Sequence, residues 1–225
     1  MILLDTLKSD IQAIFERDPA ARNLIEVLLC YPGLHAIFCY RITHWLYCLG
    51  FPILPRLTSH LVRFFTGIEI HPGAIIGKGV FIDHGMGVVI GETALVGNHS
   101  LIYQGVTLGG TGKEMGKRHP TLGTNVIVGA GAKILGNIQI GDRVLIGAGS
   151  VVLRNVPSNC TVVGVPGRIV RHQGNPINSL DHLNLPDTEA EIVGTLYSRI
   201  SLLEHEFDSL KTLLVSKTLQ EAEGQ

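Results

Sequence analysis

The chain carries little charge and no excess of either sign. Only 16% of its 225 residues are charged, and 18 basic against 19 acidic residues give a formal net charge of −1. Bulk electrostatics therefore do not draw the protein toward nucleic acid or anionic lipid, and neither is expected as a partner. Substrates and partners have to be inferred from particular residues.

Long uninterrupted hydrophobic runs are also lacking. Asp5 and Asp10 interrupt the apolar residues near the amino terminus, and Glu26 and Pro32 interrupt the most apolar later stretch. A secretory signal needs an uncharged core, and a membrane-spanning helix needs about 20 apolar residues. We therefore expect a cytoplasmic protein without a membrane span.

Cysteines are few and irregularly spaced, at positions 30, 39, 48 and 160. They form no Cys-x-x-Cys pair, which argues against a zinc or redox motif, and without an export signal a disulfide framework is not expected. We expect buried free thiols.

Aliphatic residues, in contrast, recur every six positions through the middle of the chain. Three series are present: Ile70, Ile76 and Ile82; Ile90, Val96, Ile102 and Leu108; and Leu122, Val128, Ile134, Ile140, Ile146 and Val152. A period of six fits short strands coiled into a triangular prism with one inward aliphatic residue on each side. Glycines then occupy the corners, where the chain turns. The pattern predicts a left-handed parallel β-helix over residues 67–170.

The fold class is therefore α+β, with an N-terminal helical domain at residues 1–66 before the β-helix. A solenoid needs its terminal apolar face covered, so we expect these helices to cover the open end of the coil. Apolar spacing and the breaks at proline and glycine predict four helices, at about residues 2–18, 21–30, 34–49 and 57–65.

After the coil we expect a linker at residues 171–187 and a C-terminal helix at residues 188–225. Two arrangements fit this helix: a trimeric coiled coil, or an amphipathic helix folded back on its own subunit. The spacing alternates between four and three, as in a coiled-coil seam, at Leu196, Ile200, Leu203, Phe207, Leu210 and Leu214.

Residues 109–121 lack inward aliphatic residues and are predicted to loop out of the coil. Loops ejected from a rigid scaffold commonly carry functional residues. Arg118 and His119 stand at the far end of this loop and add a cation and a donor where an anionic substrate can bind.

The densest polar cluster in the coil is Asp83-His84. Glu69 and His71 stand about one coil earlier, so we expect them to come close to this pair. A carboxylate beside an imidazole fixes its tautomer and raises its basicity, which lets histidine act as a general base on a hydroxyl.

Several segments are specific beyond the repeat: Asp18-Pro19-Ala20, residues 40–46, Ile70-His71-Pro72, residues 83–93, residues 107–113, Arg118-His119-Pro120 and residues 129–136. Together they resemble the serine O-acetyltransferase family of hexapeptide-repeat acyltransferases, over about residues 10–170. The resemblance implies transfer of acetyl from acetyl-CoA to the hydroxyl of L-serine, giving O-acetyl-L-serine and CoA, the first step of cysteine biosynthesis from serine.

The resemblance also implies roles for single residues. His84 matches the general base and Glu69 its acidic partner, where many members carry aspartate. The amino-acid substrate is then held at both ends: its ammonium by Asp18 and Asp83, and its carboxylate by Arg118 and His119.

Acetyl-CoA is expected as co-substrate, in a groove between neighbouring β-helices, and no metal is expected. Small residues at Gly110, Ala130 and Ala148 would let the pantetheine arm approach, and Arg168 would meet a CoA phosphate; the alternative for all four is ordinary corner packing. Direct transfer fits because no activated nucleophile is apparent. Backbone amides near Gly109 and Gly110 are candidates to stabilise the oxyanion.

Other functions remain open from the residues alone. A related hexapeptide acetyltransferase acting on a sugar or other hydroxylated acceptor would not need the amino-acid clamp. A scaffold solenoid would leave the polar cluster unexplained. A zinc-dependent γ-class carbonic anhydrase uses three histidines, and beyond His71 and His84 only His99 lies on a plausible coil.

For the assembly, the resemblance favours a homotrimer, because most of the longer amino terminus that joins two trimers in enterobacterial-type members is missing here. L-cysteine is expected as a feedback inhibitor, since the clamp is intact. Members that dock onto cysteine synthase commonly end in isoleucine, whereas this chain ends in Gln225, so that complex is doubtful.

Overall fold

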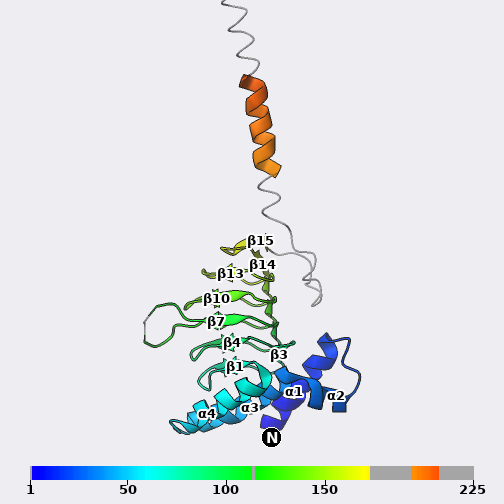
Figure 1. The fold of residues 1–225 in the computed structure, drawn as a ribbon, viewed down its shortest axis with the longest axis vertical. Coiled ribbons are helices and arrows are strands. Elements are labelled where there is room, and N and C mark those ends of the chain that lie inside the picture. Colours follow the sequence, from blue (N-terminus) through cyan, green and yellow to red (C-terminus); the bar gives the residue numbers. More distant parts are fainter. Residues whose placement is uncertain (1, 113–114, 173–193, 208–225) are drawn as a thin grey trace, which may run out of the picture. The chain divides into compact units, whose positions relative to one another are not determined.

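In a computed structural model of the chain, residues 2–112, 115–172 and 194–207 are described (Figure 1). The chain divides into two compact units, residues 1–185 and 186–225. The first unit begins with four helices: α1 (Ile2–Arg17), α2 (Leu24–Cys30), α3 (Pro32–Cys48) and α4 (Leu54–Thr66). In the second unit, residues 194–207 form a helix.

Short strands follow α4 in the first unit. They are β1 (Glu69–Ile70), β2 (Ile75–Ile76), β3 (Phe81–Ile82), β4 (Val89–Ile90), β5 (Leu95–Val96), β6 (Leu101–Ile102), β7 (Thr107–Gly109), β8 (Thr121–Leu122), β9 (Ile127–Val128), β10 (Lys133–Leu135), β11 (Gln139–Ile140), β12 (Leu145–Ile146), β13 (Val151–Val152), β14 (Cys160–Val163) and β15 (Arg168–His172). β15 extends two residues beyond the expected end of the coil, and residues 173–187 of the expected linker lie outside the described residues.

Every third strand joins the same sheet, so the chain coils with three sides. One sheet has the order β1-β4-β7-β10-β13, the second β2-β5-β8-β11 and the third β3-β6-β9-β12-β14-β15. Neighbours pair in parallel, except β15, which pairs antiparallel with β14. The domain is thus a parallel β-helix, whose stacked coils are visible in Figure 1.

The thirteen predicted inward positions are all buried, at 7% exposure or less, and they share one hydrophobic cluster. The strand register places aliphatic residues of successive coils above one another: Ile90 pairs with Ile70 below and with Leu108 above. Since burial of apolar surface stabilises by about 25 cal/mol per Å², this column of aliphatic side chains is the main cohesive element of the coil.

Helix α3 covers the first coil, as expected. Its Ala36, Ile37 and Tyr40 belong to the same buried cluster as the coil residues. The Tyr40 hydroxyl donates to the Ala74 carbonyl oxygen at 2.6 Å. Gly33 lets the start of the helix approach β3, because a Cβ atom there would lie 2.0 Å from the Ile82 carbonyl oxygen.

A buried ion pair joins α1, α3 and the coil. Arg41 donates to both carboxylate oxygens of Asp10, at 2.9 and 3.1 Å, and also to the carbonyl oxygens of Ile76 and Gly77. Asp10, only 1% exposed, also accepts the Gly79 N–H at 2.8 Å. These five hydrogen bonds hold α1 and α3 on the end of the coil.

The coil departs from its six-residue rhythm at two corners. Ile82 and Ile90 are eight positions apart, so the corner between β3 and β4 holds two extra residues, and the connection from β7 to β8 is longer still. Residues 110–112 and 115–120 of that connection leave the coils as a projecting loop (Figure 1). The predicted loop of residues 109–121 is one residue too long at each end, because Gly109 ends β7 and Thr121 begins β8. Both irregular corners carry predicted site residues.

All four cysteines are free, but the expectation that they are buried is wrong for most of them. Cys160 alone is buried, while Cys30 and Cys48 are exposed because they face outward from α2 and α3. In the described ranges no single helix is long and apolar enough to cross a membrane; α2 and α3 meet that test only as a pair bent by 72°.

Candidate functional site

The widened corner between β3 and β4 presents His84. Its backbone φ of 57° lies in the left-handed region, which non-glycine residues adopt infrequently. The following Gly85 is also left-handed, and its N–H donates to the Asp83 carbonyl oxygen at 2.6 Å. The turn leaves the His84 side chain exposed and Asp83 half-buried, so the imidazole is accessible to a substrate.

Asp18, which follows α1, lies at the same corner. Its two carboxylate oxygens accept the Ala20 N–H at 2.8 Å and the Tyr31 hydroxyl at 2.6 Å. Burial raises the pKa of Tyr31, and the negative charges of Asp18 and Asp83 raise it further. Tyr31 therefore donates to Asp18 and lies within electrostatic reach of Asp83, which places both predicted ammonium-binding carboxylates around one tyrosine.

Tyr31 was not identified from the sequence. It occupies the break between α2 and α3, and its ring packs against Phe81 of β3 with centroids 6.4 Å apart. No local motif marks this residue; its role depends on how the helices dock on the coil.

Glu69 makes a different contact from the one expected. Its carboxylate pairs with the Arg63 guanidinium of α4 at 2.7 Å. Glu69 belongs to β1 and stacks beside Val89 of β4 rather than beneath His84. Its role as the acidic partner of His84 remains a prediction.

Arg118 and His119 lie at a second corner, where the projecting loop returns to β8. Thr93 organises them: its hydroxyl oxygen accepts the N–H groups of Arg118 at 3.0 Å and His119 at 3.1 Å. The Thr93 carbonyl oxygen also accepts from the Lys117 ammonium at 2.6 Å. A single residue of the coil below therefore holds the end of the loop. Thr93 falls within a segment noted for its specificity, but its function there was missed.

The surroundings of His119 fix its tautomer. The Thr93 N–H donates to Nδ1 at 3.2 Å, so Nδ1 is an acceptor and the neutral ring carries its proton on Nε2. Burial, with the charge of Arg118 next, lowers the His119 pKa. The ring lies over Gly91, where a Cβ atom would approach Nε2 to 2.1 Å. His119 is thus a neutral N–H donor, suited to binding a carboxylate.

Arg118 donates to the carboxylate of Glu92, and this contact lowers the Glu92 pKa. A guanidinium has five N–H donors, so an Arg118 oriented by Glu92 retains donors for a substrate carboxylate. Glu92 is a second residue that sequence reasoning missed.

His71 belongs to this second corner, and the expectation that it lies near His84 is wrong. Burial lowers its pKa to about 4, and its electrostatic neighbours are Arg56, Glu92, Arg118 and His119. The first coil is twenty residues long, because it contains the widened corner, so His71 stacks beneath residue 91. Among the described residues no three His, Cys, Asp or Glu side chains gather as a metal site.

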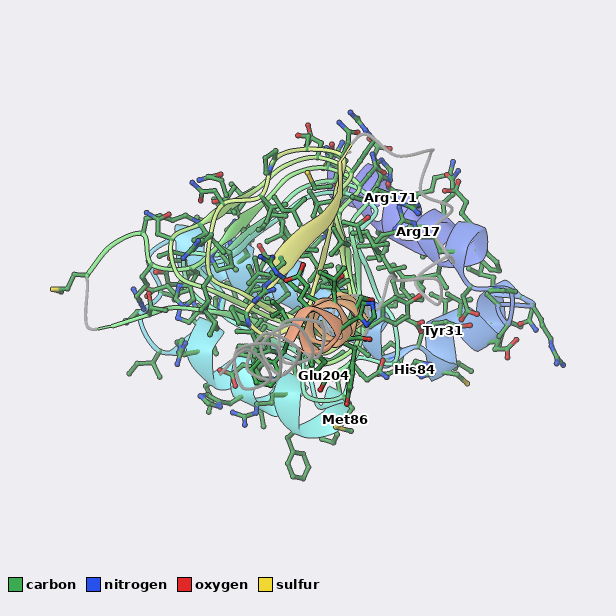
Figure 2. The ribbon with its side chains drawn as sticks, turned by 90° about the horizontal axis from the view of Figure 1, so that it is seen from above. Arg17, Tyr31, His84, Met86, Arg171 and Glu204 are labelled. Carbon is green, nitrogen blue, oxygen red and sulfur yellow. The ribbon has the colours of Figure 1, made fainter. Side chains whose placement is uncertain are left out.

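The two clusters therefore occupy different corners of one prism. Asp83 and His84 connect the third sheet to the first, whereas Arg118 and His119 lie between the first sheet and the second. Seen from above in Figure 2, Tyr31 and His84 lie on the side flanked by α1 and α2, and the projecting loop extends from the opposite side. One copy of the chain does not close the predicted clamp on itself.

The four candidate CoA contacts are divided similarly. Ala130 and Ala148 occupy the corner column above His84, where the Gly149 N–H donates to the Ala130 carbonyl oxygen at 2.8 Å. Gly110 instead lies against Arg118 and His119. A Cβ atom added to Gly110 would lie 3.2 to 3.4 Å from atoms of these two residues. Arg168 is exposed at the start of β15.

Comparison with known proteins gives two family matches. Residues 2–39 match "Serine acetyltransferase, N-terminal", and residues 119–154 match "Bacterial transferase hexapeptide (six repeats)". A serine acetyltransferase of Synechocystis sp. is 68% identical over 209 residues, which cover 93% of this chain and 84% of that protein.

Solved structures agree with this likeness. The crystal structure of Neisseria gonorrhoeae serine acetyltransferase in complex with serine matches with a TM-score of 0.74 and 46% identity, covering 76% of this chain and 69% of that one. A serine acetyltransferase complex with cysteine matches with a TM-score of 0.75 and 47% identity, covering 76% and 66%. The chain therefore belongs to the serine acetyltransferase family of acyltransferases.

Proposed function

We propose that this chain transfers the acetyl group of acetyl-CoA to the hydroxyl of L-serine, giving O-acetyl-L-serine and CoA. The observation that carries the assignment of the site is the widened corner, where an exposed His84 follows Asp83 and where Tyr31 binds Asp18 within electrostatic reach of Asp83. An imidazole beside an ammonium-binding carboxylate pair suits an amino-acid acceptor better than a sugar.

In this mechanism His84 removes the proton from the serine hydroxyl as the oxygen attacks the thioester carbon. The negative tetrahedral oxygen is stabilised by backbone N–H groups near Gly109 and Gly110. Its collapse breaks the carbon–sulfur bond, and the departing CoA thiolate takes the proton back from His84. Glu69 orients His84 in this scheme, after it exchanges Arg63 for the imidazole.

We infer further that the site is shared between copies in a homotrimer. A threefold arrangement can bring the His84 corner of one prism against the Arg118 corner of the next, because each copy has both corners. Asp18 and Asp83 of one copy then bind the serine ammonium, and Arg118 and His119 of its neighbour bind the carboxylate. Acetyl-CoA lies along Ala130, Ala148 and Gly110 in the groove between them, with Arg168 near a CoA phosphate.

Two finer proposals accompany this one. The coil is left-handed, as its six-residue period and three short strands per turn favour; an experimental structure would show its hand directly. L-cysteine binds the same clamp, since it shares the ammonium and carboxylate of serine, and competes with it. The related structure in complex with cysteine supports this second proposal.

The principal test measures thiol release from acetyl-CoA with L-serine, with simple sugars run alongside. We expect serine-dependent release that falls about 10²- to 10⁴-fold in His84→Ala, the usual contribution of a general base. Thiol release with sugars alone would indicate an acetyltransferase that acts on a sugar. No release with any acceptor would favour a non-enzymatic scaffold protein.

Mixing experiments test the shared site. His84→Ala and Arg118→Ala should each be inactive alone. In trimers refolded from an equal mixture, each site combines one corner from each of two copies at random. About a quarter of the sites should then have both corners intact and regain activity. Absence of any regained activity in verified mixed trimers would place the whole site within one copy.

A further inference from the structure

The helix at residues 194–207 exposes an apolar face within its own unit. Leu196, Ile200, Leu203 and Phe207 are between 52% and 68% exposed. Their spacings of four, three and four place them on one side of the helix. A groove on this side is lined by Ile200, Leu203, Glu204 and Phe207. Such a continuous apolar stripe on a helix calls for a partner surface.

The stripe has heptad form. With Ile200 and Phe207 at the a positions, Leu196 and Leu203 occupy the d positions. The opposite side of the helix carries Ser198, Ser201 and His205, with Leu202 as its one large apolar residue in the described range. In the sequence, Leu210 and Leu214 continue the same spacing, although they lie outside the described residues.

Charges beside the stripe select the partner. In this register Arg199 is at a g position and Glu204 at the next e position. In a parallel, in-register coiled coil the g residue of one helix faces the e residue five positions later on its neighbour. Arg199 of one copy would therefore face Glu204 of another. The two residues cannot face each other within one helix, since five positions span well over one turn.

We propose that this helix forms a parallel, in-register coiled coil with the same helix of other copies of the chain. Complementary charge at Arg199 and Glu204 favours this occupant over the body of its own subunit. That the coiled coil has three helices rests on the trimer proposed above. Self-association of the helix does not depend on that proposal.

Disulfide trapping tests the contact in the full-length protein. Leu203→Cys places a thiol in the seam, and His205→Cys is the matched control on the polar side. Under mild oxidation we expect linked dimers from Leu203→Cys well above the wild-type background set by the four native thiols, and none above it from His205→Cys. Equal linking of the two variants, or none in either, would overturn the proposal.

Charge exchange then tests the register, in the Leu203→Cys background. Arg199→Glu should slow disulfide trapping about fivefold, as expected for repulsion repeated at each interface. Adding Glu204→Arg should restore the original rate. Failure of the double change to restore trapping would exclude the parallel register. Both outcomes are independent of acetyl transfer, so they remain readable even if the proposed reaction is wrong.

Discussion

Thr93 presents two donors to one nitrogen of His119. Its hydroxyl lies 2.9 Å and its backbone N–H 3.2 Å from Nδ1 of the ring. Because the same hydroxyl oxygen accepts the N–H groups of Arg118 and His119, its own hydrogen is directed to the ring. The orientation of the proposed carboxylate-binding pair thus depends on Thr93, which holds both residues.

Thr93→Val should keep the shape of the side chain but remove these hydrogen bonds. Buried N–H groups that lose an acceptor cost about 1–3 kcal/mol each, so we expect kcat/KM for serine to fall about 10- to 100-fold. The KM for acetyl-CoA should change little. Thr93→Ser keeps the hydroxyl and should retain most activity. Equal losses in the two variants would indicate that the methyl contact, rather than the hydroxyl, matters.

Tyr31→Phe should isolate the hydrogen bond to Asp18. The ring still packs against Phe81, but Asp18 loses the donor at 2.6 Å. A loss of about 1 kcal/mol predicts a roughly fivefold rise in the KM for serine. The KM for acetyl-CoA should not change, and Tyr197→Phe, in the exposed helix, serves as the control. A uniform fall in kcat with an unchanged KM for serine would contradict this role.

The Asp10–Arg41 pair should matter far more to stability than the Arg63–Glu69 pair. Asp10→Ala leaves the Arg41 guanidinium, with a side chain only 11% exposed, buried without its carboxylate. We expect a loss of roughly 3–5 kcal/mol in the free energy of unfolding. Glu69→Gln, in a solvent-exposed pair, should cost less than about 1 kcal/mol. Urea unfolding of the two variants compares them directly, and similar losses would contradict the distinction.

The inward aliphatic positions could be predicted from the sequence because the six-residue backbone repeat alone determines them. The site could be predicted only in part. The sequence motifs identified His84 and Arg118 as site residues. Which corner of the prism a residue occupies, however, depends on the number of residues in each coil, and the first coil has twenty. The spacing of eight between Ile82 and Ile90 contains that information. It explains why His71 lies with Arg118 and not with His84.

The contacts of Tyr31 and Glu92 could not be predicted in the same way. Tyr31 reaches Asp18 only because α2 and α3 are bent against β3, an angle that no local pattern specifies. Glu92 meets Arg118 across a projecting loop whose length leaves its return path open. Long-range packing, rather than propensity, decides both contacts.

His71 predicts how stability should depend on pH. Its Nδ1 accepts the Gly73 N–H at 2.9 Å, and burial, with the cations Arg56 and Arg118 nearby, lowers its pKa from 6.5 to about 4. Between pH 6.5 and 4 the unfolded chain therefore binds a proton that the folded chain rejects. The contribution of His71 to stability is complete above pH 6.5 and is lost progressively as the pH falls to 4.

His71→Asn offers a matched comparison, because an asparagine oxygen can accept the same N–H two residues ahead without titrating. The other titratable groups are the same in both proteins, so their effects on stability cancel in the difference between the two urea midpoints. We expect wild type to lose stability relative to His71→Asn as the pH is lowered from 6.5 to 4, with a constant difference above that window. A difference that stays constant throughout would show that His71 protonates as readily in the folded chain as in the unfolded one, and that the second corner is wetter than its burial indicates.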